Sequence, residues 1–363
     1  MKPPDRVSTA AGHGAFFGQL VHWQRQHGRH DLPWQNTRDP YRVWLSEIML
    51  QQTQVVTVLG YYPRFLARFP NVQALAAANV DEVLALWSGL GYYSRARNLH
   101  RCAQEVVQQW GGAFPRTSAE LQTLHGIGPS TAAAIASFCF GERISILDGN
   151  VKRVLTRLLA FGGDLAEAAQ ERLLWQHAQD LLPAQPSHDD MAAYTQGLMD
   201  LGATLCTRSK PQCLLCPVQA LCQAQAQQRS TDFPVKTRKL KRRTETWWLL
   251  ALRRPDGAIW LSQRPVRGIW AGLYSLPVFH GEAELHAAVP GAMEQVPGAV
   301  VHGTLRHALT HRDLVLHPLE LPWPAATAPA TLGDGVWVER VSALDLGLPA
   351  PVRRWLEAQL PRC

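Results

Sequence analysis

Four cysteines lie within seventeen residues of this chain, in the pattern C-x6-C-x2-C-x5-C: Cys206, Cys213, Cys216 and Cys222. Thiolates this close in sequence can enclose one metal centre within a single loop. Four thiolates are the usual ligands of iron–sulfur clusters in proteins. A structural zinc ion is the alternative, but four-cysteine zinc sites favour two paired C-x2-C segments. The spacing therefore favours an iron–sulfur cluster over zinc.

The remaining cysteines, Cys102, Cys139 and Cys363, stand apart from this group and bring the count to seven. An odd, scattered set is not a disulfide framework and fits a reducing compartment. Residues 1–19 have no apolar core of the signal-peptide type, and no run approaches the roughly 20 apolar residues of a membrane span. We therefore expect a cytoplasmic protein with no membrane association.

Charge and length narrow the class of protein. The formal net charge is +7, which favours an anionic partner, with nucleic acid first. The 363 residues are long for one domain and suit two. Residues 14–227 have helical spacing of apolar residues, for example at Tyr41, Trp44, Leu45 and Ile48, with glycine-rich turns between the helices.

The residue pattern changes near the middle of the chain, from helical spacing to short strand-like segments. Residues 244–363 predict a smaller α+β domain, in which 247–252 and 258–261 form strands joined by the turn Pro255-Asp256-Gly257. Between the two domains, residues 228–243 form a basic linker that has six Lys or Arg among its last eight positions. Such a run either contacts phosphate or stays solvated.

A second motif is the segment 124–135, which reads LHGIGPSTAAAI. Gly126 and Gly128 allow a tight turn between two helices, and proline is tolerated in the first turn of the helix that begins near Pro129. Backbone N–H groups at such a turn can bind a phosphate oxygen. We interpret it as a helix-hairpin-helix element, against the alternative of an ordinary helix–helix turn.

Two carboxylates are candidates for catalysis. Asp148 precedes the helix expected over 151–159, where it can serve as an N-cap, as a catalytic group, or as both. Glu47 lies three residues from Trp44 and from Leu50 on a helix, and apolar neighbours raise the pKa of a carboxyl so that it can act as a general acid. Gln52 continues the same apolar face with an amide, which needs a partner such as a base edge.

Together these segments resemble the endonuclease III / MutY superfamily of DNA glycosylases, and within it the MutY family. The resemblance also covers Leu32–Trp34 and Gly89–Leu99 and extends over nearly the whole chain. It implies a mostly α helix-hairpin-helix glycosylase domain with a [4Fe–4S] cluster on the four cysteines, followed by a MutT-like (Nudix-like) domain. The implied activity is base excision repair by a monomer that removes adenine opposite 8-oxoguanine or guanine in double-stranded DNA.

The resemblance also implies roles for single positions. Glu47 matches the general acid that protonates adenine, Asp148 the carboxylate that stabilises the oxocarbenium-like sugar, and Asn150 a polar group near the sugar. The other matches contact bases, in the adenine pocket (Trp34, Leu50, Gln196), as wedges in the duplex (Gln52, Tyr92) and at the oxidised guanine (Thr53, Leu90).

One position separates branches of the superfamily. Relatives that also cut the DNA strand have a lysine where this chain has Ser130, and that lysine forms a Schiff base with the sugar. A serine cannot form this intermediate, so the resemblance implies a monofunctional glycosylase that uses water.

The second domain departs from true Nudix hydrolases. Gly268–Pro277 matches a Nudix-type segment, but the following residues lack the R-E-x-x-E-E carboxylates that would hold Mg2+. The resemblance therefore implies that this domain recognises 8-oxoguanine without hydrolysing a nucleotide. The family uses a Phe-Ser-His loop for this, which Leu309-Thr310-His311 replaces here, preceded by His307. The alternative is that these residues only pack the domain.

Two other functions remain open from the sequence. One is a glycosylase of the same fold that removes a different base, such as thymine from a mismatch. The other is a DNA-binding iron–sulfur protein without activity, in which Glu47 and Asp148 would be dispensable.

Overall fold

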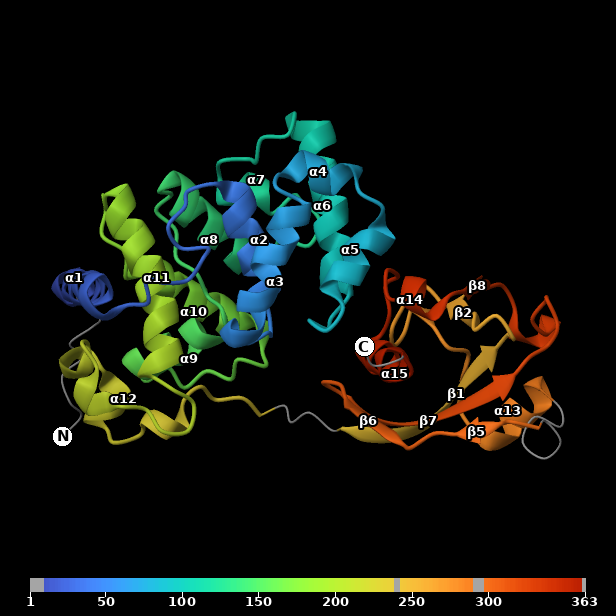
Figure 1. The fold of residues 1–363 in the computed structure, drawn as a ribbon. Coiled ribbons are helices and arrows are strands. Elements are labelled where there is room, and N and C mark those ends of the chain that lie inside the picture. Colours follow the sequence, from blue (N-terminus) through green and yellow to red (C-terminus); the bar gives the residue numbers. More distant parts are fainter. Residues whose placement is uncertain (1–9, 238–241, 290–296, 361–363) are drawn as a thin grey trace. The chain divides into compact units, whose positions relative to one another are not determined.

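The computed structural model describes residues 10–237, 242–289 and 297–360 (Figure 1). Residues 238–241 of the expected basic linker and Cys363 lie outside this range. Contacts between Cα atoms divide the chain into two compact units, one made of 1–76 and 101–239 and the other of 77–100 and 240–363. None of the helices in the described ranges is long and apolar enough to cross a membrane.

The first two-thirds of the chain are helical, as the apolar spacing predicted. The helices are α1 (Ala10–His27), α2 (Pro40–Leu50), α3 (Val55–Arg68), α4 (Val72–Ala77), α5 (Val80–Trp87), α6 (Ser94–Trp110), α7 (Ser118–Leu121), α8 (Pro129–Phe140), α9 (Gly149–Leu158), α10 (Ala168–Asp180), α11 (His188–Thr204) and α12 (Gln223–Ala226). Short 3-10 helices lie within the cysteine loop, at Cys213–Leu215 and Gln219–Leu221, and after it, at Ser230–Asp232.

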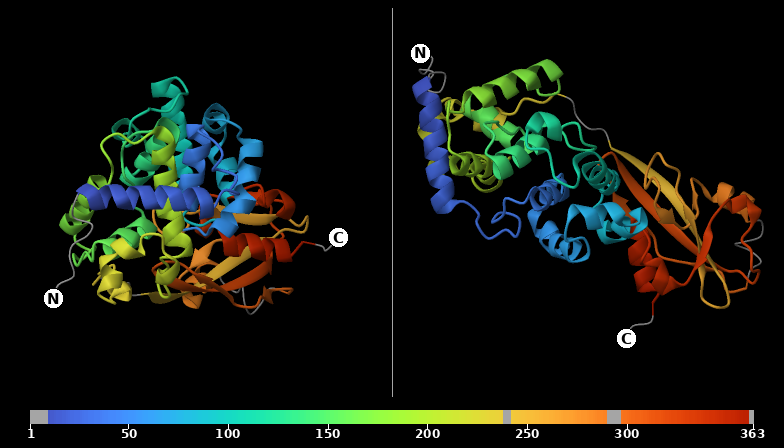
Figure 2. Two further views of the ribbon diagram at one scale, coloured as in Figure 1. Left: turned by 90° about the vertical axis from the view of Figure 1, so that its left-hand side faces the viewer. Right: turned by 90° about the horizontal axis from the view of Figure 1, so that it is seen from above.

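The core of the first unit lies between α1, α8, α9, α10 and α11. α1 crosses α11 (Figure 2), and Phe17 of α1 stacks on Tyr194 of α11 with 4.8 Å between ring centroids. α8 is almost entirely apolar and ends at Gly141, whose left-handed φ of 70° makes the αL cap that favours glycine. This packing fixes α11 and the start of α8, which both carry candidate site residues.

The second unit contains an eight-stranded mixed sheet with the order β3-β2-β1-β7-β5, to which β4, β6 and β8 add at β1, β7 and β2. Its strands are β1 (Arg243–Arg253), β2 (Ile259–Gln263), β3 (Tyr274–Ser275), β4 (Val278–Phe279), β5 (Val300–Val301), β6 (Leu305–Ala308), β7 (Arg312–Pro322) and β8 (Val336–Val338). The remaining elements are α13 (Glu282–Ala288), α14 (Arg340–Ala343), α15 (Ala350–Ala358) and the 3-10 turn Ala330–Leu332.

The predicted hairpin is present, since β1 pairs antiparallel with β2. The longest ladder of the sheet, however, is the parallel pairing of β1 with β7, from Arg243 opposite Arg312 to Arg253 opposite Pro322. Apolar periodicity in the sequence does not predict this parallel pairing. The pairing brings the start of β1 beside the turn that contains Thr310.

Candidate active site

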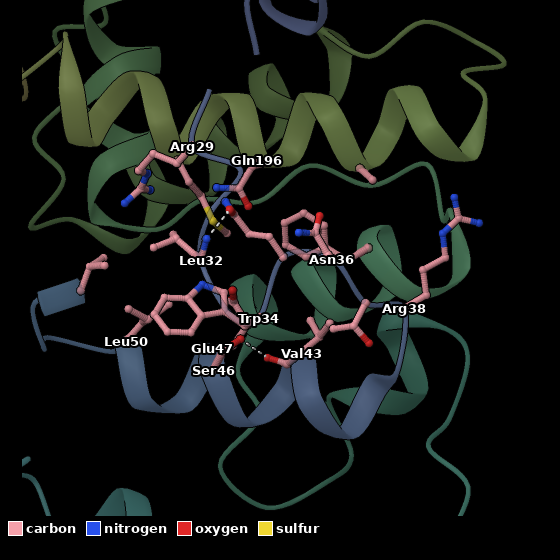
Figure 3. Close-up of a pocket in the computed structure, with 16 residues that line it drawn as sticks. Arg29, Leu32, Trp34, Asn36, Arg38, Val43, Ser46, Glu47, Leu50 and Gln196 are labelled. Atoms are coloured by element: carbon pink, nitrogen blue, oxygen red, sulfur yellow. Dashed lines mark hydrogen bonds between the residues drawn. The ribbon is translucent and has the colours of Figure 1, made fainter. Parts of the chain in front are cut away.

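A cavity of about 390 Å³ opens between α2 and α11 (Figure 3). α2 contributes Glu47 and Leu50 on one side and α11 contributes Gln196 on the other, while Trp34 comes from the connection between α1 and α2. Four residues singled out separately in the sequence thus share one cavity. Its volume is at the small end of the range for ligand pockets and suits a single nucleobase.

The sequence around α2 explains how Glu47 reaches the cavity. Asp39 caps the helix, accepting a hydrogen bond from the backbone N of Tyr41 at 2.9 Å, and Pro40 occupies the first turn. Trp44 and Ile48 are buried in the core of the unit. Since side chains three and four residues apart share a helix face, the helix is fixed by this apolar face and holds Glu47 at the edge of it.

Burial, followed by the negative charge of Asp148, raises the pKa of Glu47 to about 8. Both causes disfavour the ionised carboxylate, so the side chain is mainly protonated at neutral pH. A protonated carboxyl in a base-sized cavity can donate a hydrogen bond or a proton to a ring nitrogen. The sequence predicted the direction of this shift.

Asp148 has the structural role that the sequence left open. Its Oδ1 accepts a hydrogen bond from the backbone N of Val151 at 2.7 Å and caps α9. Burial raises the pKa of Asp148, while the N–H groups of Val151 and Asn150 and the charges of Arg153 and Lys152 lower it. Because the charge of Asp148 also raises the pKa of Glu47, we infer that the two carboxyl groups lie near each other.

Asn150 is held by its own helix. Its Oδ1 accepts a hydrogen bond from Arg153 at 2.8 Å, and the same guanidinium donates to the carbonyl oxygens of Cys206 and Gly202. A Cβ at Gly202 would approach that of Asn150 to 2.8 Å, so this close contact needs glycine. Arg153 thereby connects the start of α9 to the first cysteine of the loop.

Two residues of the cavity region were missed by the sequence analysis. Asp200 is fully buried, and its carboxylate accepts hydrogen bonds from Arg29 Nε at 2.7 Å and from Gln196 Nε2 at 2.8 Å. Because a carboxylate only accepts, the amide N of Gln196 must face Asp200 and its Oε1 must face elsewhere. The spacing of four residues on one helix could have indicated the pair, but Arg29 is 171 residues away from Asp200 in sequence.

The four cysteines of the loop line one cavity, together with Arg157. Arg157 is 2% exposed and donates hydrogen bonds to Cys206 Sγ at 3.3 Å and to the carbonyl oxygen of Thr207 at 2.7 Å. Burial raises the pKa of Cys216 to about 12 and that of Cys222 to about 11, and the neighbouring cysteines add to both shifts. Thiolates in this loop therefore require a positively charged partner.

The interpretation of Gln52 as part of a buried helix face is wrong. α2 ends at Leu50, and Gln52 follows with a left-handed φ of 57° and an exposed side chain. Thr53 lies in the same turn, with its Oγ1 3.4 Å from the carbonyl oxygen of Gln51. The amide of Gln52 is available to a partner outside the protein, and it needs no partner in the core.

The predicted helix hairpin is present at residues 124–131. Gly126 has a left-handed φ of 75° and Gly128 is the N-cap of α8, with Pro129 in the first turn. Ser130 Oγ accepts a hydrogen bond from the backbone N of Leu147 at 3.1 Å. Ser130 therefore supports the strand-like segment that leads to Asp148.

The other predicted residues lie in the second unit. Tyr92 has a left-handed φ of 49°, and its hydroxyl is hydrogen bonded to that of Thr310. Both line a cavity of about 560 Å³ together with His307 and His311, whereas Leu90 is buried. Burial, and next the charge of Arg354, lowers the pKa of His307. Of the residues expected at the oxidised guanine, His307, Thr310 and His311 thus line one cavity with Tyr92, whereas Leu90 and Thr53 do not line it.

Comparisons with known proteins follow the same division of the chain. Residues 45–179 match the model of the HhH-GPD superfamily of base excision DNA repair proteins, and residues 248–358 match that of the NUDIX domain. The adenine DNA glycosylase of Buchnera aphidicola subsp. Baizongia pistaciae (strain Bp) is 34% identical over 93% of this chain and 95% of its own. That of Homo sapiens is 46% identical over 58% of this chain and 39% of its own.

Solved structures resemble the helical part. A thermostable thymine-DNA glycosylase superposes with a TM-score of 0.51 and 26% identity, over 59% of this chain and 97% of its own. A non-covalent endonuclease III–DNA complex gives a TM-score of 0.50 at 20% identity, over 61% and 98% of the two chains. The second likeness concerns the fold alone.

Proposed function

Since the chain belongs to the adenine DNA glycosylase family, we propose that it removes adenine from double-stranded DNA where adenine is paired with 8-oxoguanine or guanine. The observation that supports this most is Glu47, a carboxyl with a raised pKa in a cavity of the size of one base. We assign excision to residues 14–227 and recognition of the oxidised guanine to residues 244–363.

Glu47 acts as the general acid in this proposal. Adenine is a poor leaving group as an anion, and a proton on a ring nitrogen lets it depart neutral. With a pKa of about 8, Glu47 holds that proton at neutral pH and can transfer it as the bond to the base breaks. The C1′–N9 bond breaks as its electron pair moves to the protonated base.

Asp148 stabilises the positive charge that then develops on the sugar. Burial raises the pKa of Asp148, and its N-cap hydrogen bonds and the charges of Arg153 and Lys152 oppose that shift and favour the ionised carboxylate. Two neighbouring carboxyl groups in different environments are the usual arrangement for an acid and an anion in glycoside hydrolysis. Water adds to C1′ and loses a proton, which leaves an abasic site. Asn150 is a polar group near the sugar during this step.

Ser130 does not take part as a nucleophile. Its hydroxyl accepts the N–H of Leu147, which positions the segment before Asp148. Because the hairpin offers no amine at this position, no Schiff base forms and the enzyme is monofunctional.

Base selection follows from the orientation of Gln196. With its amide N on Asp200, Gln196 offers Oε1 to the cavity, and Arg29 offers donors from the same wall. Adenine has a donor at N6 and an acceptor at N1, which match this pair, whereas guanine has O6 and N1–H in the reverse order. Trp34 and Leu50 enclose the base on its apolar faces. The site thereby selects adenine by attraction and rejects guanine by repulsion.

The partner base is read by the second unit and by the turn after α2. Gln52 and Tyr92, both with left-handed φ, enter the duplex where adenine has left it. Thr53 and Leu90 border the oxidised guanine. His307, Thr310 and His311 recognise it from the sheet, so this domain binds a base and hydrolyses no nucleotide.

The four cysteines fit a [4Fe–4S] cluster, and Cys206, Cys213, Cys216 and Cys222 would hold it. Within the described ranges no three Cys, His, Asp or Glu residues gather tightly enough for one metal ion, although the four sulfurs line one cavity. That arrangement suits a multi-atom cluster better than a zinc ion. A cluster would supply the positive charge that the buried thiolates need, and thiolate ligands of this kind suit a reducing cell interior.

DNA backbone binding belongs to the hairpin. The turn at Gly126 and Gly128 exposes N–H groups at the start of α8, and a phosphate oxygen is their natural acceptor. The proposal takes the enzyme to act as a monomer.

One experiment tests the proposed reaction. The purified protein is incubated with duplexes that pair adenine with 8-oxoguanine, guanine or thymine, and thymine with guanine, and alkali-labile sites are counted. We expect adenine release led by the 8-oxoguanine duplex, and more than 100-fold slower release by Glu47→Gln. Release of thymine instead would assign another substrate, and full activity of Glu47→Gln would refute the acid role.

A second experiment tests the water mechanism. Borohydride added during adenine release should trap no covalent adduct in the wild-type protein. An adduct that forms as fast as the base leaves would show that an amine takes part.

A further inference from the structure

A further cavity, of about 490 Å³, lies between residues 302–306 and the last helix of the second unit, α15. One wall consists of residues 302–304, which connect β5 to β6, and of Leu305 and Arg306 at the start of β6. The other wall is α15, which contributes Arg354, Trp355 and Gln359. Among the described residues β6 pairs with β7, and its first two residues, Leu305 and Arg306, line this cavity. None of the roles proposed above uses it.

The walls of this cavity are positively charged. Arg306 and Arg354 are both exposed, and neither forms an ion pair with a carboxylate in the ranges that the structure describes. No Asp or Glu residue lines the cavity. Arg354 is anchored by its Nε, 3.4 Å from the carbonyl oxygen of Ala350, which leaves its two terminal nitrogens as donors.

The nearby carboxylates are already occupied by other cations. Glu320 is buried and forms ion pairs with Arg253 at 2.5 Å and Arg340 at 3.1 Å. His302 Nε2 lies 3.5 Å from the same carboxylate. Arg353, beside Arg354 in sequence, pairs with Glu357. Carboxylates thus neutralise Arg253, Arg340 and Arg353, whereas the charges of the two arginines that line the cavity are not paired with a carboxylate in the described ranges.

The remaining wall adds neutral hydrogen-bond donors. Thr304 presents its hydroxyl, which is 3.3 Å from His317 Nδ1. The indole N–H of Trp355 is buried and has no acceptor among the described residues. Two guanidinium groups, a hydroxyl and this N–H supply several donors with no carboxylate among them, which suits an anion with several oxygens.

This cavity is close in sequence to the proposed guanine-recognition turn. β6 runs from Leu305 to Ala308 and the turn with Thr310 follows directly, closed by a hydrogen bond from Leu309 N to Arg312 O at 2.7 Å. Four residues of extended chain span about 13 Å. Along a DNA strand the same length corresponds to about four base-pair steps. A duplex that reaches Thr310 can therefore also reach Arg306.

We propose that Arg306 and Arg354 form a binding site for one backbone phosphate of the DNA strand that the turn at Thr310 contacts. This inference rests on the proposed function, because it takes duplex DNA as the ligand of this surface. The site contributes affinity and register without reading a base.

The first test measures binding of the full-length protein to an undamaged duplex and to a duplex with adenine opposite 8-oxoguanine, as a function of salt. Because the two arginines share one phosphate, Arg306→Gln with Arg354→Gln should lower the slope of log K against log salt by about one in total. At 0.1 M salt this corresponds to roughly tenfold weaker binding by the double variant. The charge-conserving pair Arg306→Lys with Arg354→Lys should retain most of the slope.

The matched control is Arg172→Gln. Arg172 is an exposed arginine of α10 in the other unit, and it has no carboxylate partner within the described ranges. This control should leave the slope unchanged. Wild-type slopes in the glutamine pair, or an equal loss in the control, would refute the proposal. The slope on undamaged DNA does not depend on excision, so failure of the proposed reaction would be seen separately as absence of adenine release by the wild type.

The second test locates the phosphate. Uncharged methylphosphonates are placed one at a time over six positions on each side of the 8-oxoguanine. One position should weaken the wild type and have no effect on the glutamine pair. Calorimetry with inorganic phosphate and with dATP tests whether the site binds a free phosphate compound instead of DNA. The assignment to DNA is wrong if every methylphosphonate acts equally on the wild type and on the double glutamine variant, and that variant loses only the binding of free phosphate, dATP or an acidic peptide.

Discussion

At the scale of single residues, Glu47 shows how function and stability oppose each other. An ordinary glutamate has a pKa near 4.3 and would be ionised at neutral pH. Burial and the charge of Asp148 raise that pKa to about 8 and keep the acid protonated. The same environment makes the ionised form costly, so the property that suits Glu47 to the proposed role of general acid also destabilises the folded chain at neutral pH.

The first prediction concerns the pH dependence of excision. Since Glu47 must be protonated, the single-turnover rate should be constant from about pH 6 to 7 and fall about tenfold per pH unit above pH 8. Rapid-quench measurements on the duplex with adenine opposite 8-oxoguanine would show the profile. A rate that stays flat to pH 10 would remove Glu47 as the proton donor.

The second prediction concerns folding stability. The pKa of Glu47 is higher in the folded than in the unfolded chain, so the folded protein loses stability as pH rises from about 4.3 to about 8. Glu47→Gln lacks this loss and should be more stable by about 3 kcal/mol at pH 7, but equal to the wild type at pH 4. Urea unfolding at the two pH values would measure the difference. Equal stability at both would contradict a raised pKa.

The third prediction concerns Gln196. Its Oε1 is expected to accept the N6 amino group of adenine, and replacement by Met removes that acceptor at similar volume. Excision of adenine should fall about tenfold, whereas excision of purine, which has no amino group, should change little. Rates for both bases opposite 8-oxoguanine in the two proteins test this. An equal loss for both bases would indicate only a disturbed pocket.

Residue-level expectations from sequence succeeded where helix spacing determines the environment. The apolar neighbours of Glu47 at positions three away predict its raised pKa, and the N-cap of α9 follows from Asp148 preceding an apolar helix. Asp200 was not found because its importance comes from Arg29, which the fold brings from another element. Gln52 was placed on a helix that ends two residues earlier, since propensity alone does not fix a helix terminus.

At the scale of elements, α9 has a candidate catalytic carboxylate at its start and contacts the cysteine loop near its end. α9 carries Asp148 at its first turn and Arg157 near its end, where the guanidinium contacts Cys206. Its apolar face is buried over its whole length. A rigid helix therefore connects the proposed catalytic carboxylate with the proposed cluster, in a distance of about three turns.

The fourth prediction compares the two glycines of the hairpin. Gly126 has a φ of 75°, so Gly126→Ala should destabilise the protein by about 1 kcal/mol and weaken DNA binding. Gly128 has a φ of −85°, and a Cβ there meets open space. Gly128→Ala should keep the melting temperature, yet weaken DNA binding, because the methyl group would occupy the expected place of a phosphate. Unaltered DNA binding by Gly128→Ala would place the phosphate elsewhere.

The elements themselves were largely predictable. The helices at 40–50 and 149–158 and the hairpin of β1 with β2 follow from apolar spacing and turn residues. The parallel ladder between β1 and β7 joins residues 69 positions apart, and single-sequence periodicity has no information about such a pairing. Residues 77–100 contain α5 and the start of α6, as their apolar spacing predicted. Their grouping with the sheet in one compact unit was not predicted.

At the scale of the whole molecule, the second unit is assembled from two stretches of chain that lie far apart in sequence. Tyr93 Oη and Ser88 Oγ both donate to the carbonyl oxygen of Leu348, at 2.9 Å and 3.1 Å, and Arg97 donates to that of Ala271 at 2.7 Å. Apart from Thr53, the residues proposed to contact the oxidised guanine come from these two stretches. The proposed reading of that base therefore depends on their association.

The fifth prediction tests this association. Tyr93→Phe leaves the buried carbonyl oxygen of Leu348 with one donor fewer and should cost about 1 kcal/mol. Hydrogen exchange should then accelerate in both 77–100 and 344–350, and remain unchanged in α1 and α11. The matched control is Tyr41→Phe, which removes an equivalent buried bond to Phe69 O within the first unit and should accelerate exchange only there. If Tyr93→Phe affected one of its two stretches alone, the two would not open together, and the base-reading surface could not be one cooperative unit.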